Sequence, residues 1–192
     1  MRIPLIILLA AAAACNGGRG SLSSGLDMSC LDWEHGRSLQ WGFKYCIGLE
    51  VFDDLFLGAR ATIPVPSLVI IGNQVSYGVE TAWLPVHPME GFAVRVSASA
   101  LRFHMWPEHV IVILVDGDTP EPPPEYPYET AEGFGLQVLL SPGYAWKNLA
   151  LWLDLGIDHR VMEVERMVEG RMTGGDHDFT GPCFGLGFGL FL

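Results

Sequence analysis

The sequence predicts an all-β protein, an up-and-down antiparallel transmembrane β-barrel of about eight strands, from three observations. Hydrophobic residues make up 49% of the 192 residues and charged residues only 17%. Even so, no stretch after residue 20 approaches the roughly 20 unbroken apolar residues that a membrane helix needs. Apolar side chains instead recur at alternate positions, which is the period of a β-strand. The end of the chain shows this alternation with glycine between the apolar groups.

The terminal segment, residues 180–192, has two unlike faces. One face is almost bare because it is made of Gly185, Gly187 and Gly189. The other face is large and apolar, and it comprises Phe184, Leu186, Phe188, Leu190 and Leu192. A strand with one face in water normally carries Thr, Lys or Glu there, since glycine weakens a strand and covers nothing. The pattern therefore favours glycines inside a narrow barrel and apolar groups facing lipid.

The first 14 residues are typical of a secretory signal peptide. They contain one basic residue, a short apolar core and small residues before a cleavage position. Two alternatives remain open, ordinary cleavage after Ala14 or lipidation of Cys15, and both predict export. The rest of the chain divides into an N-terminal segment with a weak first strand, residues 15–37, and one barrel domain, residues 38–192.

The first half of the chain predicts five strands. These are a weak strand within residues 20–33 and clear strands at 38–51, 55–63, 74–83 and 92–100. In each clear strand, apolar residues alternate with small or polar residues. Phe52-Asp53-Asp54 predicts a tight turn, and a short connection is expected at His87. Pro64 and Pro66 end the third strand at a loop, because proline cannot donate to a β-ladder.

Beyond residue 100 the alternation loses phase until Pro107. The apolar run 110–115 is either an extension of the same strand past a bulge, which we favour, or a separate hairpin strand. Residues 116–132 predict a long acidic, proline-rich loop. The remaining expected elements are strands at 134–140 and 149–157, a turn at Ser141-Pro142-Gly143 between them, and a polar loop at about 163–179 before the terminal strand. Short connections thus alternate with long ones, as in an up-and-down barrel.

The face opposite the large apolar residues carries the charges of the clear strands. These are Lys44, Glu50, Arg60, Glu80, Arg95, Asp154 and Asp158. The same face is rich in Gly, Ser and Ala, as a narrow lumen filled by side chains requires. In such a lumen the three basic and four acidic groups are expected to pair, because an unpaired buried charge is very costly.

Aromatic residues on the apolar face, or close to the ends of strands, are expected to meet the membrane interface. They are Trp41, Tyr45, Trp83, Tyr144 and Trp146. Strands close to 9–11 residues also suit a tilted crossing of the membrane. Both features favour the barrel over the alternative, a secreted or lipid-anchored soluble β-sandwich binding module. A sandwich would segregate its faces in the same way, but its apolar faces would meet in a core.

By these features the chain resembles the small eight-stranded bacterial outer-membrane barrels, such as the OmpA transmembrane domain and OmpX. The resemblance covers residues 38–192 and includes the final Phe188-Gly189-Leu190-Phe191-Leu192. It implies insertion into the cell outer membrane by the barrel-assembly machinery, with the apolar face of the terminal strand as the membrane-assembly signal. Barrels of this type usually end in Phe, whereas this chain ends in Leu192.

The resemblance also implies that the lumen charges form a gated polar plug that passes small ions. A static salt-bridge core that only fills space is the other interpretation, and the one we favour. The functional prediction is a structural, adhesive or narrow-pore role. The loop 116–132 is either an adhesive segment that binds an extracellular partner or a surface spacer.

No catalytic site is expected. His104, His109 and His159 lie near strand ends, but no spacing links them with inward Ser97 and Ser99 as a triad. Neither a metal nor another cofactor is predicted, because the acidic segment 176–178 is interpreted as part of a solvated loop. The formal net charge of −11 argues against nucleic-acid binding.

Three cysteines follow Cys15, namely Cys30, Cys46 and Cys183. An oxidising compartment permits one disulfide and one odd thiol among them. Cys30 with Cys183 would join the two ends of the barrel if the first and last strands are neighbours, but geometry and not sequence decides that pairing.

Overall fold

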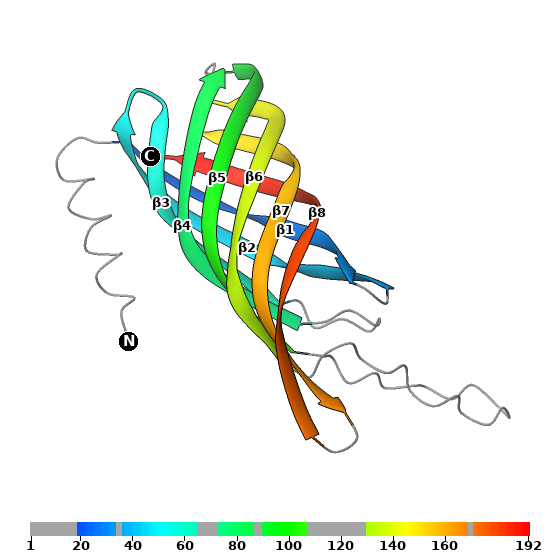
Figure 1. Cartoon of the computed structure of the whole chain (residues 1–192). Helices are drawn as coiled ribbons and strands as arrows, with labels where there is room; N and C mark the ends of the chain where they lie inside the picture. Colours follow the sequence, from blue (N-terminus) through cyan, green and yellow to red (C-terminus); the bar gives the residue numbers. More distant parts are fainter. Residues whose placement is uncertain (1–18, 34–35, 65–72, 87–89, 107–129, 169–170) are drawn as a thin grey trace, which may run out of the picture.

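Eight antiparallel strands close into one barrel (Figure 1). The computed structural model describes residues 19–33, 36–64, 73–86, 90–106, 130–168 and 171–192. The strands are β1 (Gly20–Trp33), β2 (Gly36–Phe52), β3 (Leu55–Pro64), β4 (Asn73–Val86), β5 (Glu90–Trp106), β6 (Thr130–Trp146), β7 (Leu149–Val168) and β8 (Arg171–Phe191). Each strand pairs with its neighbours in the sequence, and β1 pairs with β8. No helix among these residues is long and apolar enough to cross a membrane.

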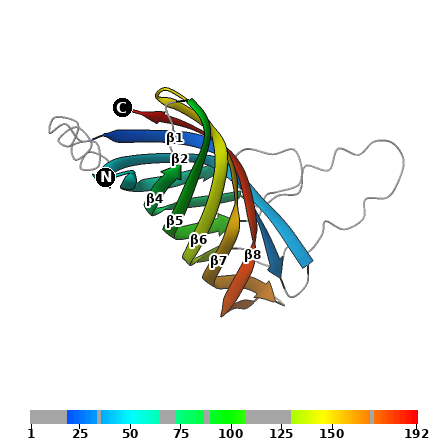
Figure 2. The ribbon, with the colours of Figure 1, turned by 90° about the horizontal axis from the view of Figure 1, so that it is seen from above.

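The register of the strands fixes the shape of the barrel. One row of paired residues runs through all eight strands, from Phe188 through Ser24, Tyr45, Ala61, Tyr77, Arg102, Phe134 and Val161 to Asp178. The row starts and ends on β8, so the stagger around the barrel is the ten residues between Phe188 and Asp178. With ordinary strand spacings this stagger tilts the strands by roughly 40°. Figure 2 shows the tilted strands wrapping in sequence order.

The two ends of the barrel differ. The turn end holds the two-residue turns Asp53-Asp54 and Lys147-Asn148, together with Leu192. Asp54 and Lys147 take positive φ values of 59° and 53°, which these tight turns require. Backbone hydrogen bonds between Gly20 and Leu192 tie the first and last strands together there. The opposite end is the loop end.

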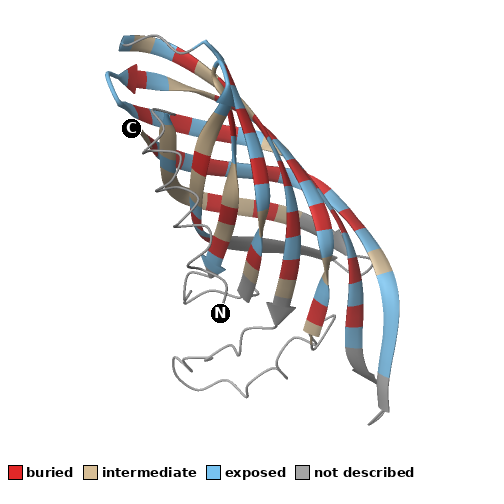
Figure 3. Cartoon of the chain, turned by 90° about the vertical axis from the view of Figure 1, so that its left-hand side faces the viewer, coloured by how far each residue is buried: buried red, intermediate tan, exposed pale blue. Residues whose placement is uncertain are grey.

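Buried and exposed residues alternate along the strands (Figure 3). On β8, Phe184, Leu186 and Phe188 face outward and are exposed, whereas Gly185 and Gly187 face inward. The bulky apolar residues therefore lie on the outside of a single closed barrel. This arrangement confirms the predicted fold and rules out the β-sandwich, in which these residues would meet in a core.

The predicted turn at 141–143 is wrong. β6 continues to Trp146, and the chain reverses at Lys147-Asn148. Pro142 is tolerated within β6 because the β6–β7 ladder skips it, pairing Leu140 with Leu155 and Gly143 with Trp152. Proline thus removes local pairing without changing the direction of the strand.

The expected loop at about 163–179 is also wrong. Residues 163–168 and 171–179 belong to the long strands β7 and β8, in which Glu163 pairs with Asp176 and Val161 with Asp178. Likewise β5 runs on to Trp106, and Thr130–Glu132 begin β6 rather than end the acidic loop. The apolar run 110–115 and the rest of that loop lie outside the described residues.

These strand ends were missed because polarity inverts towards the loop end. There the inward side chains are apolar and form one buried cluster, the loop-end cluster: Leu101, Phe103, Ala131, Met162, Val164 and Phe179. The outward positions between them are polar and exposed, including Arg102, Glu132 and Glu163. Side chains still point alternately inward and outward, but here the inward residues are apolar and the outward residues between them are polar.

Candidate functional site

The barrel interior holds a network of buried charges. Six of the seven predicted charges are buried there, namely Lys44, Arg60, Glu80, Arg95, Asp154 and Asp158. Two more were missed, Asp27 on the weak first strand and Arg160 on the part of β7 beyond the expected strand. Four acidic and four basic side chains are thus buried among the described residues. Extending the alternation by one more inward residue, two residues past Asp158, would have found Arg160.

Arg60 lies at the centre of this network. Its guanidinium group pairs with Asp27 and lies 3.6 Å from Glu80 Oε2. It also donates to Ser99 Oγ at 3.1 Å, and Ser99 in turn donates to Glu80 Oε2 at 3.2 Å. The side chain of Arg60 is fully buried, so these contacts stand in for the water it has lost.

Two further pairs connect neighbouring parts of the lumen. Arg95 pairs with Glu80, and Lys44 pairs with Asp154. Cys46 Sγ lies 3.6 Å from Glu80 Oε2. Glu80 therefore contacts two arginines and a thiol, which makes it the main acceptor on the turn-end side of the network.

Asp158 and Arg160 close the network towards the loop end. Asp158 Oδ2 accepts hydrogen bonds from Ser29 Oγ at 2.9 Å and from Arg160 Nε at 3.0 Å. The Arg160 guanidinium also lies over the Phe103 ring, 3.9 Å from its centroid. A side chain at position 135 would disturb this contact, since a Cβ on Gly135 would lie 2.7 Å from Phe103 and 3.0 Å from Arg160.

Several buried polar atoms in the lumen have no hydrogen-bond partner within the described part of the chain. They include Asp27 Oδ1, Thr62 Oγ1, Gln137 Oε1 and Asp158 Oδ1. Buried polar groups of this kind are usually satisfied by ordered water. The arrangement is therefore typical of a hydrated charge network rather than of a dry core.

An apolar cluster closes the lumen at the turn end. This turn-end cluster consists of Phe56, Ala82, Leu84, Ala93, Ala145, Ala150 and Trp152, with Phe191 packed against it. The rings of Phe56 and Phe191 have centroids 5.9 Å apart. Phe191 thus turns inward and covers the mouth, while Leu192 faces outward with 66% exposure. A Cβ on Gly143 would lie 2.6 Å from Trp152, so glycine there makes room for the indole.

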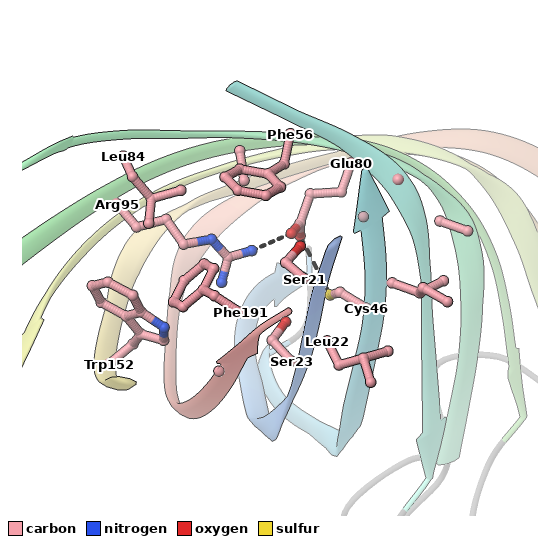
Figure 4. A pocket seen from close by; sticks show the side chains of 16 residues that line it. Ser21, Leu22, Ser23, Cys46, Phe56, Glu80, Leu84, Arg95, Trp152 and Phe191 are labelled. Carbon is pink, nitrogen blue, oxygen red and sulfur yellow. Dashed lines mark hydrogen bonds and ion pairs between the residues drawn. The ribbon is translucent and has the colours of Figure 1, made fainter. Parts of the chain in front are cut away.

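A small cavity of about 30 Å³ lies between this cluster and the charges (Figure 4). Cys46, Glu80 and Arg95 line its polar side, and Phe56, Leu84, Trp152 and Phe191 line its apolar side. The volume suits about one or two water molecules. It is too small for an organic ligand.

Glu50 differs from the other predicted lumen charges. It is only partly buried and lies at the turn end, where its carboxylate pairs with Arg19 and accepts from Arg19 Nε at 2.7 Å. Its Oε1 also accepts from the backbone N–H of Asp54 at 2.9 Å. The hydrogen bond that Arg19 donates to Glu50 raises the pKa of Arg19 above its ordinary value. Glu50 thus fastens the start of β1 to the β2–β3 turn.

The outer surface carries the predicted aromatic residues. Tyr45, Trp83, Tyr144 and Trp146 are all exposed, and Tyr144 packs on Trp146 with centroids 4.8 Å apart. The side chain of Trp41 lies outside the described residues. Phe52 and Phe92, which the sequence analysis did not single out, are exposed at the same turn end. Leu190 of the terminal strand is only partly exposed.

The residues considered for catalysis do not come together. His104 binds Glu132 at 2.7 Å and His159 binds Thr180 at 2.8 Å, in exposed positions on the outer surface. Ser97 and Ser99 are buried inside the barrel, on the other side of its wall. His109 lies outside the described residues. Within the described ranges no group of His, Cys, Asp and Glu suits a metal ion.

The disulfide considered between Cys30 and Cys183 does not form. Cys30 and Cys183 are free thiols, as is Cys46. The register pairs Cys183 with Ser29, so the neighbouring Cys30 points to the opposite face of the sheet. Adjacent strands alone do not permit the bond, because both side chains must also share a face.

Comparison with known proteins defines the class of fold. The chain matches no protein-family model. No curated protein matches its sequence. Among solved structures, Neisserial surface protein A matches with a TM-score of 0.50 at 12% identity, covering 89% of this chain and 96% of that one.

Two further solved structures show weaker matches. They are Ail, the attachment invasion locus protein of Yersinia pestis, and the N-terminal β-barrel domain of Pseudomonas aeruginosa OprF. Both have a TM-score of 0.47 and cover 91% of this chain and 99% of their own, at 14% and 15% identity. The match to Neisserial surface protein A, with the register described above, gives this chain the fold of the small eight-stranded outer-membrane barrels.

Proposed function

We propose that the protein is an integral outer-membrane barrel, with its turn end in the periplasm and its loop end outside the cell. The exposed apolar surface supports this proposal. On β7 the outward residues from Leu149 to Ile157 are all apolar and exposed, and a stretch of this length suits a tilted crossing of the hydrocarbon core. Beyond it, His159 and Glu163 mark the return to water.

Within that class, we infer a structural or adhesive scaffold with a closed interior. The observation that carries this inference is the position of the two apolar clusters. Among the described residues, the loop-end cluster and the turn-end cluster lie on either side of the charge network. An ion that passed either cluster would lose its water against apolar side chains, which is costly, so the arrangement favours a closed interior over conduction.

Two measurements on the refolded protein test this function. Heat-modifiable migration on a gel reports insertion as a folded barrel, and the unboiled sample is expected to run differently from the boiled one. Planar bilayer recordings are expected to show no discrete conductance steps. A soluble, unmodified species would contradict the membrane assignment, and regular conductance steps would contradict the closed interior.

A narrow pore is the second candidate, and one observation favours it. The Glu80–Arg95 pair lines the same cavity as Phe191, which covers the turn end. If these pairs exchange partners during conduction, Arg60→Ala and Arg95→Ala will change the conductance. If they only fill space, both variants will lose stability and leave the bilayer silent.

The expected partners follow from the same placement. The outward residues Phe184, Leu186 and Phe188 would present the terminal strand to outer-membrane lipid and to the barrel-assembly machinery. Residues 130–132 of the loop predicted at 116–132 belong to β6, and the remaining residues 116–129 are proposed to contact an extracellular partner, because they lie between β5 and β6 at the loop end. Shortening that loop is expected to leave heat-modifiable folding unchanged and to abolish cell adhesion, if adhesion is its role.

A further inference from the structure

The seam between β1 and β8 is incomplete. Its ladder begins at Ser21 and Phe191 and ends at Ser29 and Cys183. β8 nevertheless continues to pair with β7 as far as Arg171. Figure 1 shows the β7–β8 hairpin diverging from β1 and β2 beyond this point. The seam stops next to Pro182, which has no N–H to donate to a ladder.

The loop-end part of β8, before Pro182, therefore has an open edge. Residues 174–178 pair with β7 from Glu165 to Val161 on one side. Their other side has no strand partner within the described part of the chain. Such an edge presents a row of backbone N–H and C=O groups that can template a further strand.

Nothing described blocks this edge sterically. Gly174 and Gly175 carry no side chains, and a Cβ built on either would meet no atom closer than 3.6 Å. Asp176 and Asp178 are exposed. The edge is thus open along its backbone and flanked by carboxylates.

Those carboxylates belong to a larger acidic surface. Glu132, Glu163 and Asp176 lie directly opposite one another on β6, β7 and β8, and all three are exposed. Arg102 and His104 lie against Glu132, whereas Glu163 and Asp176, placed directly opposite each other, repel one another. A strand bearing cations would relieve that repulsion, so the charge of the surface specifies the charge of its partner.

A second copy of the chain in the same membrane does not fit the edge. Two barrels side by side would be related by a two-fold axis along the membrane normal. Strands tilted by roughly 40° would then cross at roughly 80°, and strands that cross so steeply cannot share a ladder. The acidic surfaces of two copies would also repel.

We propose that the β8 edge at residues 174–178 binds an extended, basic segment of another extracellular polypeptide by strand addition. Backbone hydrogen bonds along the edge hold the segment, and Asp176 and Asp178 bind its cationic side chains. This proposal rests on the membrane orientation proposed above, which leaves this part of β8 outside the cell.

The test uses the full barrel in lipid nanodiscs and a short peptide of alternating lysine and valine. Amide hydrogen exchange of the N–H groups in 174–178 that point away from β7 is expected to be fast in the free protein and to slow when the peptide binds. The same peptide N-methylated at alternate residues keeps its charge but cannot form the ladder. It is expected to bind at least about tenfold more weakly and to leave the exchange fast.

Charge reversal supplies the second arm. Asp176→Lys with Asp178→Lys replaces two attractive cross-strand pairs by repulsive ones, and is expected to weaken peptide binding about tenfold. Asp53→Lys, in an exposed turn at the other end of the barrel, is the matched control and should not change the affinity.

Equal binding of the two peptides would overturn the proposal. So would slow exchange, without any peptide, of the N–H groups in 174–178 that point away from β7. If the protein gives either result but remains heat-modifiable on a gel, the strand-addition proposal fails and the outer-membrane assignment stands. Loss of heat-modifiable folding by the wild-type protein would instead refute the proposed function itself.

Discussion

Arg60 is the basic side chain at the centre of the charge network, since it contacts both Asp27 and Glu80. Arg60→Met keeps most of the volume, removes the cation that pairs with Asp27, and leaves Glu80 paired with Arg95 alone. We expect a loss of about 3–5 kcal/mol of unfolding free energy, as for other broken buried pairs. Urea unfolding in lipid vesicles, followed by tryptophan fluorescence, measures it.

Arg102→Met is the control for this change. Arg102 pairs with Glu132 across 3.4 Å on the outer surface, and both side chains are about half exposed. Its loss should change stability by no more than about 0.5 kcal/mol. If the two variants lose the same amount, the buried network is not what stabilises the barrel.

Gly135 tests the fit between the charge network and the loop-end cluster. Gly135→Val would place its Cβ against Phe103, Arg160 and the His159 carbonyl oxygen, the last at 2.6 Å. We expect a destabilisation of about 1–3 kcal/mol from this overpacking. Gly174→Val is the matched change on β8, where a Cβ meets only the Val164 carbonyl oxygen at 3.8 Å. It should cost much less in the same unfolding assay.

At the scale of single strands, the exchange of polarity along β7 and β8 would mark the limit of the membrane under the proposed placement. Leu153→Arg places a charge in the middle of the apolar stretch of β7, where we expect a loss of about 2–4 kcal/mol. Asp178→Arg lies beyond that stretch, in an exposed position, and should change stability little. Unfolding from vesicles measures both, and similar losses would mean that the boundary lies elsewhere.

At the scale of the whole molecule, closure of the turn end depends on Phe191, which covers the cavity lined by Cys46. Phe191→Ala should expose the Cys46 thiol to a small water-soluble alkylating reagent, and labelling should become several-fold faster. Peptide mapping by mass spectrometry identifies which thiol has reacted. Phe188→Ala, on the outward face of the same strand, is the control and should leave labelling slow.

Fast labelling of Cys46 in the wild-type protein would show that the turn end is open. That result would favour the narrow pore over the closed scaffold. Both residues are phenylalanines near the end of β8, one facing inward and the other outward, so the comparison tests closure and not the stability of the terminal strand.

The barrel itself was predictable because alternation is a local property. A side chain on a strand faces the same side as those two residues away, so Phe184 to Leu192 revealed their faces without any knowledge of their partners. The same rule placed Lys44, Glu80 and Asp154 inside. Turns were less predictable, since Pro142 suggested a reversal that the chain makes only at Lys147-Asn148.

The sequence alone determined the strand period, the inside-out distribution of apolar residues and most of the lumen charges, because each depends only on neighbours along the chain. Only the tertiary structure decided which charges pair, that Cys30 and Cys183 stay apart, and that Phe191 closes one mouth while the β8 edge stays open. These features depend on register across strands far apart in sequence, and on where the surroundings change from lipid to water. Neither is encoded in the alternation itself.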